Sequence, residues 1–480
     1  MNNLSIDGTE DDNQPVDDED QWQLYASSGY GNSIFLSEDI SIEKNETDEE
    51  WFDGDDFDTD NQSLNWDAPP CPAPLGISHV IKMGICNYCL SRISGLRNNN
   101  YNTLSGTEIR EQAIERDSDL SDSTGEKLCP FCENLFDDVE NISKRVLEGL
   151  QGIEVNTIQF GIHMPKDLIQ EEDRIRTKYG APGSLPLKSA LVQEIHSTIK
   201  SANDQITFVK ERPNVMVLVD ALTLRADIDI RPAYLYGRYR KFERGIPQTR
   251  WPCRACRGRG KHCTSCNETG LQYTNSVQDL IGEPIREVLK GSDTSFHGMG
   301  REDIDVRCLG GGRPFVIEIK RPELRNYSAE KLQKIVNSKS KKYVEVAELQ
   351  WCEKKRIVEV KESRTEKSYT IRFKLTEDKE IDIDEIKDKI HSLSGQLIQQ
   401  QTPKRVSHRR SDIKRERKII SISDVIIEED EIQLSLRCEA GTYVKELIHS
   451  DDGRTKPSVS GIIDSKCEVI WLDVSDIHYD

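Results

Sequence analysis

The sequence predicts an α+β protein built from more than one domain. Three observations indicate this class. Residues 149–232 alternate strand-like and helix-like periodicity, which is typical of an α/β layer. Later segments, such as 368–375 and 432–438, alternate apolar and polar residues as half-buried strands do. A chain of 480 residues is also long enough for two or three domains with hydrophobic cores. We therefore expect an α/β unit followed by a mixed sheet with flanking helices.

The net charge of −20 is concentrated at the N-terminus. Residues 1–70 contain 21 of the 85 Asp and Glu residues but only Lys44 of the 65 cations, so residues 71–480 carry 64 acidic and 64 basic side chains. So polar a segment buries too little apolar surface to offset its conformational entropy. We expect residues 1–70 to be a disordered acidic tail.

Composition argues against a membrane or secreted protein. No run of about 18 apolar residues occurs, so no transmembrane helix is expected. The N-terminus has neither the basic nor the apolar region of a secretory signal. Thirteen cysteines form four CxxC pairs plus five others, and an odd number in such a chain favours reduced thiols and metal binding over disulfides.

Two groups of paired cysteines predict structural zinc sites, of which one or both are occupied. In the first group two CxxC pairs are separated by 39 residues, and in the second two pairs fall within 14 residues. Two pairs together complete a closed tetrahedral site of four thiolates. Two unrelated surface pairs are the alternative for the first group. Because four cysteines fill each site, His262 is a bystander. The predicted ligands are Cys86, Cys89, Cys129 and Cys132, then Cys253, Cys256, Cys263 and Cys266.

The remaining elements follow from periodicity. In the first unit we expect strands at 153–162, 215–219 and 224–230 and a helix over 187–199. In the second we expect helices at 275–290, 328–337 and 384–399, and strands at 356–362, 368–375, 432–438 and 469–474.

Residues 296–320 predict a loop followed by a β-hairpin whose turn is 310–313. This register pairs Cys308 with Phe315 and buries one face of the hairpin. Asp303 then lies on the other face beside Lys320, and Asp305 faces Glu318. Solvated charges on a surface hairpin are the alternative to a functional carboxylate here.

Basic side chains interleaved with aromatic rings predict a surface for RNA, because cations bind phosphates and rings stack on bases. One such segment is 234–251, although a strand with one charged face would look the same. The other is the basic run 403–418. The candidates are Arg238, Arg240, Lys241, Arg405, Arg409 and Arg410. The acidic tail is either solvated or an arm that competes with RNA or binds a partner.

The segment 300–307, Gly-Arg-Glu-Asp-Ile-Asp-Val-Arg, resembles the catalytic motif of pseudouridine synthases. It is most similar to the archaeal and eukaryotic tRNA family that joins such a domain to a THUMP-related RNA-binding domain, the Pus-ten family. Blocks at 238–249, 402–410 and 440–446 are also similar, and the resemblance covers residues 71–480. It implies a zinc-binding THUMP-related domain at 71–240 and a catalytic domain at 241–480 with a zinc-knuckle insertion at 251–271.

The resemblance also implies a mechanism. The enzyme would isomerise tRNA T-loop uridine 54, 55 or both, with Asp303 as its single catalytic residue and no organic cofactor. Asp303 must be ionised, which a nearby cation secures by lowering its pKa. The resemblance favours Lys445 over Lys320 as that cation. Tyr369 would stack under the extruded base, with Tyr443 as the second candidate.

Arg301 would fill the gap left by the flipped base or hold phosphate. The expected partner is tRNA, at its acceptor stem and T-arm, bound by a monomer in the cytoplasm, or also in the nucleus of a eukaryote. The alternative function is a non-catalytic RNA-binding scaffold. A nuclease would need clustered carboxylates for metal ions, which occur only in the acidic tail.

Overall fold

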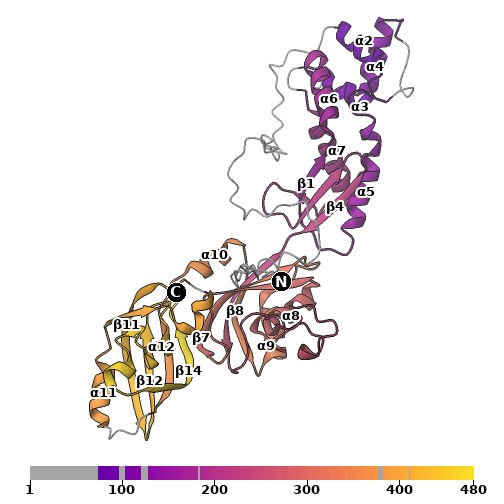
Figure 1. The fold of residues 1–480 in the computed structure, drawn as a ribbon. Helices are drawn as coiled ribbons and strands as arrows, with labels where there is room; N and C mark the ends of the chain where they lie inside the picture. The colour runs from indigo at the N-terminus through magenta and orange to yellow at the C-terminus, as the bar shows by residue number, and fades with distance from the viewer. Residues whose placement is uncertain are drawn as a thin grey trace, which may run out of the picture.

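The computed structural model describes residues 74–96, 103–120, 128–181, 184–376, 382–409 and 411–479. The predicted tail, residues 1–70, lies outside them. The described chain is elongated, with a helical tip, a small sheet and a large sheet following one another (Figure 1). Within it, no helix combines the length and apolar composition of a membrane span.

The first unit packs helices around a four-stranded sheet of order β2-β1-β3-β4. One continuous apolar core runs from the helical tip to this sheet. The predicted strands and helix of this region are confirmed. The helices are α2 (Pro74–Lys82), α3 (Asn87–Ser94), α4 (Gly106–Arg116), η1 (Leu135–Asp138), α5 (Val139–Gly149), α6 (Lys166–Tyr179) and α7 (Leu187–Ala202). The strands are β1 (Thr157–His163), β2 (Thr207–Phe208), β3 (Val215–Asp220) and β4 (Arg225–Ile230).

The second unit is a ten-stranded sheet of order β13-β10-β11-β12-β9-β14-β7-β5-β8, with β6 beside β7. The sheet is mixed. β14 pairs with β7 in parallel, whereas β14 pairs with β9 and β7 pairs with β5 in antiparallel fashion. The predicted fold class is therefore confirmed. The strands are β5 (Ala233–Lys241), β6 (Asp293–Gly298), β7 (Arg307–Lys320), β8 (Val344–Cys352), β9 (Lys367–Leu375), β10 (Leu397–Gln401), β11 (Lys414–Glu428), β12 (Glu431–Cys438), β13 (Thr455–Lys456) and β14 (Cys467–Ile477).

Helices cover this sheet in two groups, each over its own apolar cluster. The helices are η2 (Thr264–Cys266), α8 (Val277–Leu289), α9 (Ala329–Ser340), α10 (Lys355–Glu362), α11 (Ile383–His391), η3 (Lys404–Arg409), α12 (Val444–His449) and α13 (Val459–Ile463). The two halves of the sheet meet where Arg307 and Cys308 of β7 pair with Asp473 and Val474 of β14. Since β5 belongs to this sheet, the second unit begins at 233, eight residues before the boundary expected from the sequence.

The predicted hairpin at 310–313 is wrong. β7 runs without a turn from Arg307 to Lys320, and its antiparallel neighbours are β5 and β6. Its glycines instead permit close approach of other strands: a Cβ at Gly312, whose φ is +80°, would lie 2.9 Å from the carbonyl oxygen of Tyr239. Apolar alternation shows which face of a strand is buried but not which strand pairs with it.

Two other elements also differ from prediction. Residues 356–362, predicted as a strand, form the helix α10. Helical spacing places Val360 and Ile357 against the core and leaves Val358 exposed. The helix predicted over 384–399 ends at His391, and residues 397–401 instead form β10, which pairs with β11.

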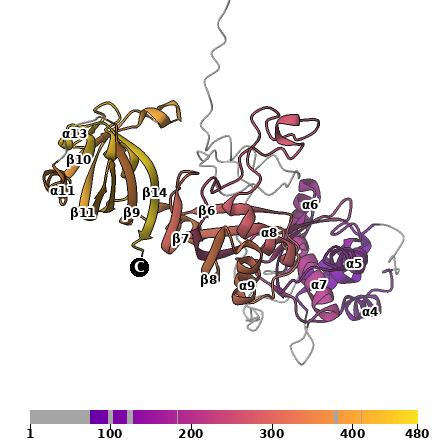
Figure 2. The same ribbon diagram turned by 90° about the horizontal axis from the view of Figure 1, so that it is seen from below.

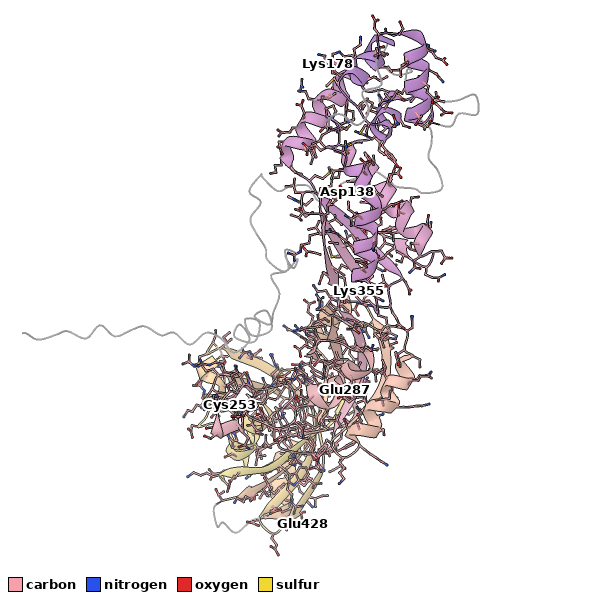
Figure 3. The ribbon with its side chains drawn as sticks, turned by 90° about the vertical axis from the view of Figure 1, so that its right-hand side faces the viewer. Asp138, Lys178, Cys253, Glu287, Lys355 and Glu428 are labelled. Atoms are coloured by element: carbon pink, nitrogen blue, oxygen red, sulfur yellow. The ribbon has the colours of Figure 1, made fainter. Side chains whose placement is uncertain are left out.

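Polar contacts connect the two units. The Glu154 carboxylate accepts hydrogen bonds from the backbone N–H groups of Arg325 (2.6 Å) and Asn326 (2.8 Å). Arg212 forms an ion pair with Glu353 at 2.6 Å, just before α10. Lys355, the first residue of α10, lies near this junction in Figure 3. These contacts set the orientation of the first unit relative to the large sheet.

Candidate active site and metal centres

Asp303 lies in the loop between β6 and β7. The backbone N–H of Val306 bonds to the Asp303 carbonyl at 3.0 Å, and Gly300, with φ +69°, turns the chain into the loop. The Asp303 side chain is 36% exposed, so a substrate can reach its carboxylate. The loop thus presents the Asp303 carboxylate near the place where the two halves of the sheet meet, with the more exposed Asp305 two residues later.

Two cations bind the Asp303 carboxylate. Arg405, from η3, places Nη1 3.2 Å from Oδ2, and Lys445, from the first turn of α12, places Nζ 3.2 Å from the same oxygen. Burial alone would raise the pKa of Asp303, but the charges of Arg405 and Lys445 outweigh it and lower that pKa below its ordinary value. Asp303 is therefore ionised at neutral pH.

These ion pairs belong to a chain of alternating charges. Arg405 Nε donates to Oε1 of the buried Glu446 at 2.7 Å, and Lys445 Nζ also contacts Asp305 at 2.9 Å. Lys445 and Glu446 are consecutive, so one turn of α12 supplies a partner for Asp303 and an anchor for Arg405. We predicted Arg405 as a phosphate contact, and nothing in a basic run marks one arginine as a carboxylate partner.

The other predicted cation, Lys320, is far from this chain of charges. It pairs with Asp293 at 3.4 Å, because β7 places it beside β6. The expected facing of Asp305 and Glu318 is also wrong, since Glu318 contacts His297. Both differences follow from the absence of the hairpin.

A buried polar cluster holds the loop from beneath. Glu302, next to Asp303, accepts hydrogen bonds from the Tyr239 hydroxyl (2.8 Å) and forms an ion pair with Arg313 at 2.9 Å. Arg313 also donates to the carbonyl of Met299 at 2.7 Å. Both charged side chains are buried. These contacts determine where the Asp303 backbone lies.

Lys241 belongs to this support, so its prediction as an RNA contact is wrong. The side chain is fully buried, and Nζ donates to the carbonyls of Ile246 (2.8 Å) and Ile304 (3.3 Å). Alternate residues of a strand share a face, so β5 turns Lys241 inward with the buried Tyr239.

The other predicted RNA contacts have partners within the protein or cannot be placed. Arg238 donates to the carbonyls of Gly311 (2.8 Å) and Ile477 (3.1 Å), and Arg240 pairs with Glu345 at 2.7 Å. The side chains of Arg409 and Arg410 lie outside the described residues.

Two of the predicted substrate contacts, Tyr369 and Tyr443, come from elements outside the loop. Tyr369 lies on β9, opposite Leu436 on β12 and Val474 on β14. Burial raises the pKa of its hydroxyl well above the ordinary value, and the charge of Asp303 adds to the rise. Tyr443 is the residue before α12, where its backbone pairs with the side chain of Gln400.

Arg301 is exposed on the loop. Its guanidinium lies 5.1 Å from the centre of the Trp251 ring, within cation–π range. Trp251 leads into the second cysteine group, so this contact connects the loop to that segment.

The two cysteine groups are each assembled in space. In both, the four sulfur atoms lie within 4.8 Å of one another, as a tetrahedral metal site requires. In the first group Cys86 Sγ lies 3.6 Å from Cys132 Sγ, and Arg92 Nη2 contacts Cys89 Sγ at 3.4 Å. This cation would offset the negative charge of four thiolates. Four sulfur donors fit a structural metal ion with no open position for catalysis.

The second group lies in a loop that projects from the large sheet near β6 (Figure 2), and Cys253 is labelled in Figure 3. Cys253 and Cys266 are buried. Gly260 and Gly270, which lack side chains, let the backbone segments of this loop pack directly against one another. His262, which we expected to be a bystander, is exposed, and its Nδ1 lies 3.8 Å from Oε1 of Glu268.

Comparison with known proteins gives one consistent family. The family description "Pus10 THUMP domain, archaeal" matches residues 142–220, and "Pus10, C-terminal" matches residues 234–478. The chain is 38% identical over 352 residues to tRNA pseudouridine synthase Pus10 of Methanocaldococcus jannaschii, covering 73% of this chain and 75% of that protein. It is 37% identical over 400 residues to the Methanothermobacter marburgensis protein of the same name, covering 82% and 95%. The Methanococcus voltae protein is 35% identical over 378 residues, covering 78% and 72%.

Proposed function

The chain belongs to the Pus10 family, whose curated members are tRNA pseudouridine synthases, and from this we propose that it isomerises T-loop uridine 54, 55 or both in tRNA with Asp303 as its single catalytic residue. The observation that carries the proposal is the exposed, ionised Asp303 held between Arg405 and Lys445. This arrangement suits a carboxylate that must act as a base or a nucleophile.

The reaction moves the bond between ribose and base from N1 to C5 of the uracil. Asp303 either takes a proton from the ribose or attacks it, and in both cases the C1′–N1 bond breaks and the C1′–C5 bond forms. Lys445 and Arg405 keep the carboxylate charged at the start. Because the hydrogen lost from C5 balances the one gained at N1, the overall change is an isomerisation and needs no organic cofactor.

The target uridine must leave its stack to reach Asp303. We assign Tyr369 as the ring that holds the extruded base, since its hydroxyl stays neutral and it lies on β9 two residues from Lys367, whose Nζ lies close to Gly300 of the loop. Tyr443 is the second candidate. Arg301, exposed on the same loop, would fill the place of the flipped base or contact phosphate.

The elongated arrangement suits one tRNA bound along the molecule (Figure 1). We assign the first unit to the acceptor stem and the large sheet to the T-arm, with a monomer as the active form. Both cysteine groups would hold Zn²⁺, because four thiolates at tetrahedral spacing favour that ion. Zinc would stabilise these segments and take no part in the chemistry.

The test is incubation with an unmodified tRNA transcript and mapping of pseudouridine by position. We expect product with the wild type, none with Asp303→Asn, and most of the activity with Asp305→Asn as the matched control. Activity in the Asp303→Asn variant would remove Asp303 from its role. If the wild type and both variants bind tRNA tightly but none forms pseudouridine, the alternative function, a non-catalytic RNA-binding scaffold, would be supported.

A further inference from the structure

Lys367 is a partly buried lysine beside the candidate active site. It begins β9, two residues before Tyr369, so both side chains share one face of the strand. A Cβ built on Gly300 would lie 3.3 Å from Lys367 Nζ, which places the ammonium at the base of the Asp303 loop. The lysine therefore lies next to the loop that carries the carboxylate and on the same face of β9 as the ring assigned to the base.

The ammonium group has no partner among the residues that the structure describes. No carboxylate lies within ion-pair distance of Nζ, and no acceptor within hydrogen-bond distance. The charge of Arg313, of the same sign, acts on Lys367, as do Cys438, Cys308 and Glu302. Other cations around the loop, such as Lys241 and Lys445, have acceptors at 2.8–3.0 Å. A partly buried cation without a carboxylate partner, open to solvent beside the candidate active site, is a candidate to bind an anionic ligand.

The reaction supplies an anion at this place. By either route open to Asp303, the C1′–N1 bond breaks with its electron pair going to the uracil, which then carries a negative charge shared by N1, O2 and O4. The free base must turn before C5 meets C1′. During that time a fixed cation near the base would lower the energy of the anion.

We propose that the Lys367 ammonium binds a carbonyl oxygen of the target uracil and stabilises the negative charge of the detached base. This rests on the proposed function, since it needs a uridine held between Asp303 and Tyr369. Lys367 is then a residue that touches the substrate, with a role separate from that of Lys445, which acts on Asp303.

If Lys367 has this role, the reaction rate should depend on pH through the protonation of its amine. Burial, and then the charge of Arg313, lowers the pKa of Lys367 to about 8. The neighbouring groups titrate elsewhere: Cys308 and Cys438 have pKa values raised to about 11, and the pKa of Asp303 is lowered. If the ammonium form is needed, the rate is full at lower pH and falls as pH rises through about 8.

The experiment measures single-turnover rates of pseudouridine formation on an unmodified tRNA transcript between about pH 6 and 9, together with tRNA affinity. The variants are Lys367→Met, Lys367→Arg and, as a control on the same strand, Lys374→Met, which removes a surface ion pair with Glu468. We expect Lys367→Met to lower the rate about 100-fold with unchanged affinity, and Lys374→Met to match the wild type. Lys367→Arg should keep measurable activity and lose the fall in rate at high pH.

Three outcomes would overturn the proposal: a Lys367→Met variant as fast as the wild type, a fall at high pH that persists in Lys367→Arg, or a wild-type rate that rises through this pH. A wild-type rate that rises with pH would mean that the neutral amine of Lys367 is needed, as a base. If Lys367→Met does not fold, the pH profile of Lys367→Arg decides alone. A wild type that forms no pseudouridine would instead refute the proposed function.

Discussion

Arg405 and Asp303 are 102 positions apart in the chain and meet at 3.2 Å in the structure. Glu446, a buried residue of α12, accepts a hydrogen bond from Nε of the same guanidinium at 2.7 Å. Arg405 is therefore fixed by one carboxylate and presented to another. Lys445 approaches the same oxygen of Asp303 from α12, so the two cations come from separate elements.

Removing Arg405 should raise the pH at which activity appears. Asp303 acts in its ionised form, and the charge of Arg405 is one of the two that lower its pKa. In Arg405→Ala that pKa should rise, so the acid limb of the single-turnover rate profile moves toward higher pH. Lys404→Ala, which breaks only an exposed pair with Asp452, is the control. An unmoved acid limb would show that Lys445 alone sets the charge of Asp303.

Tyr369 should act through its ring. Burial keeps the pKa of its hydroxyl well above the ordinary value, so the hydroxyl stays protonated across the working pH range. Tyr369→Phe should keep a rate near that of the wild type, whereas Tyr369→Ala should lose about 10- to 100-fold through lost stacking. Equal losses in both variants would argue for the hydroxyl. Tyr443→Ala tests the second candidate in the same assay.

Breaking the pair beneath the loop should destabilise the fold. Glu302 and Arg313 are buried together at 2.9 Å, so Arg313→Met leaves the buried carboxylate with only the more distant Lys241, at 3.9 Å, as a cation. We expect the free energy of unfolding to fall by about 3–5 kcal/mol, measured by urea denaturation. Arg240→Met removes a half-exposed ion pair with Glu345 and should change it by at most about 1 kcal/mol. If the two variants lose similar amounts of unfolding free energy, burial does not make the pair between Glu302 and Arg313 more important for stability than an exposed pair.

The two cysteine groups should bind metal independently. Elemental analysis of the dialysed wild type should give two zinc ions per chain. Cys86→Ser and Cys253→Ser should each give one, because each breaks one set of four thiolates. Cys352→Ser, on β8 and outside both groups, should keep two. Loss of both ions from a single substitution would mean that the sites are coupled.

The sequence alone was sufficient for features that depend on local pattern. The motif at 300–307, the spacing of the cysteines and the periodicity of most strands and helices indicated the family, the two groups of four cysteines that the structure brings together and the fold class. These features are local because a CxxC pair or an alternating strand carries its signal within a few residues.

Only the tertiary structure decided which distant side chains meet. Arg405 and Lys241 both lie in basic segments, yet one contacts Asp303 and the other is buried beneath its loop. The strand β7 looked like a hairpin because its apolar residues alternate, and its real partners β5 and β6 come from other parts of the chain. Periodicity reports the buried face of an element, whereas strand pairing and charge pairing depend on the whole packed chain.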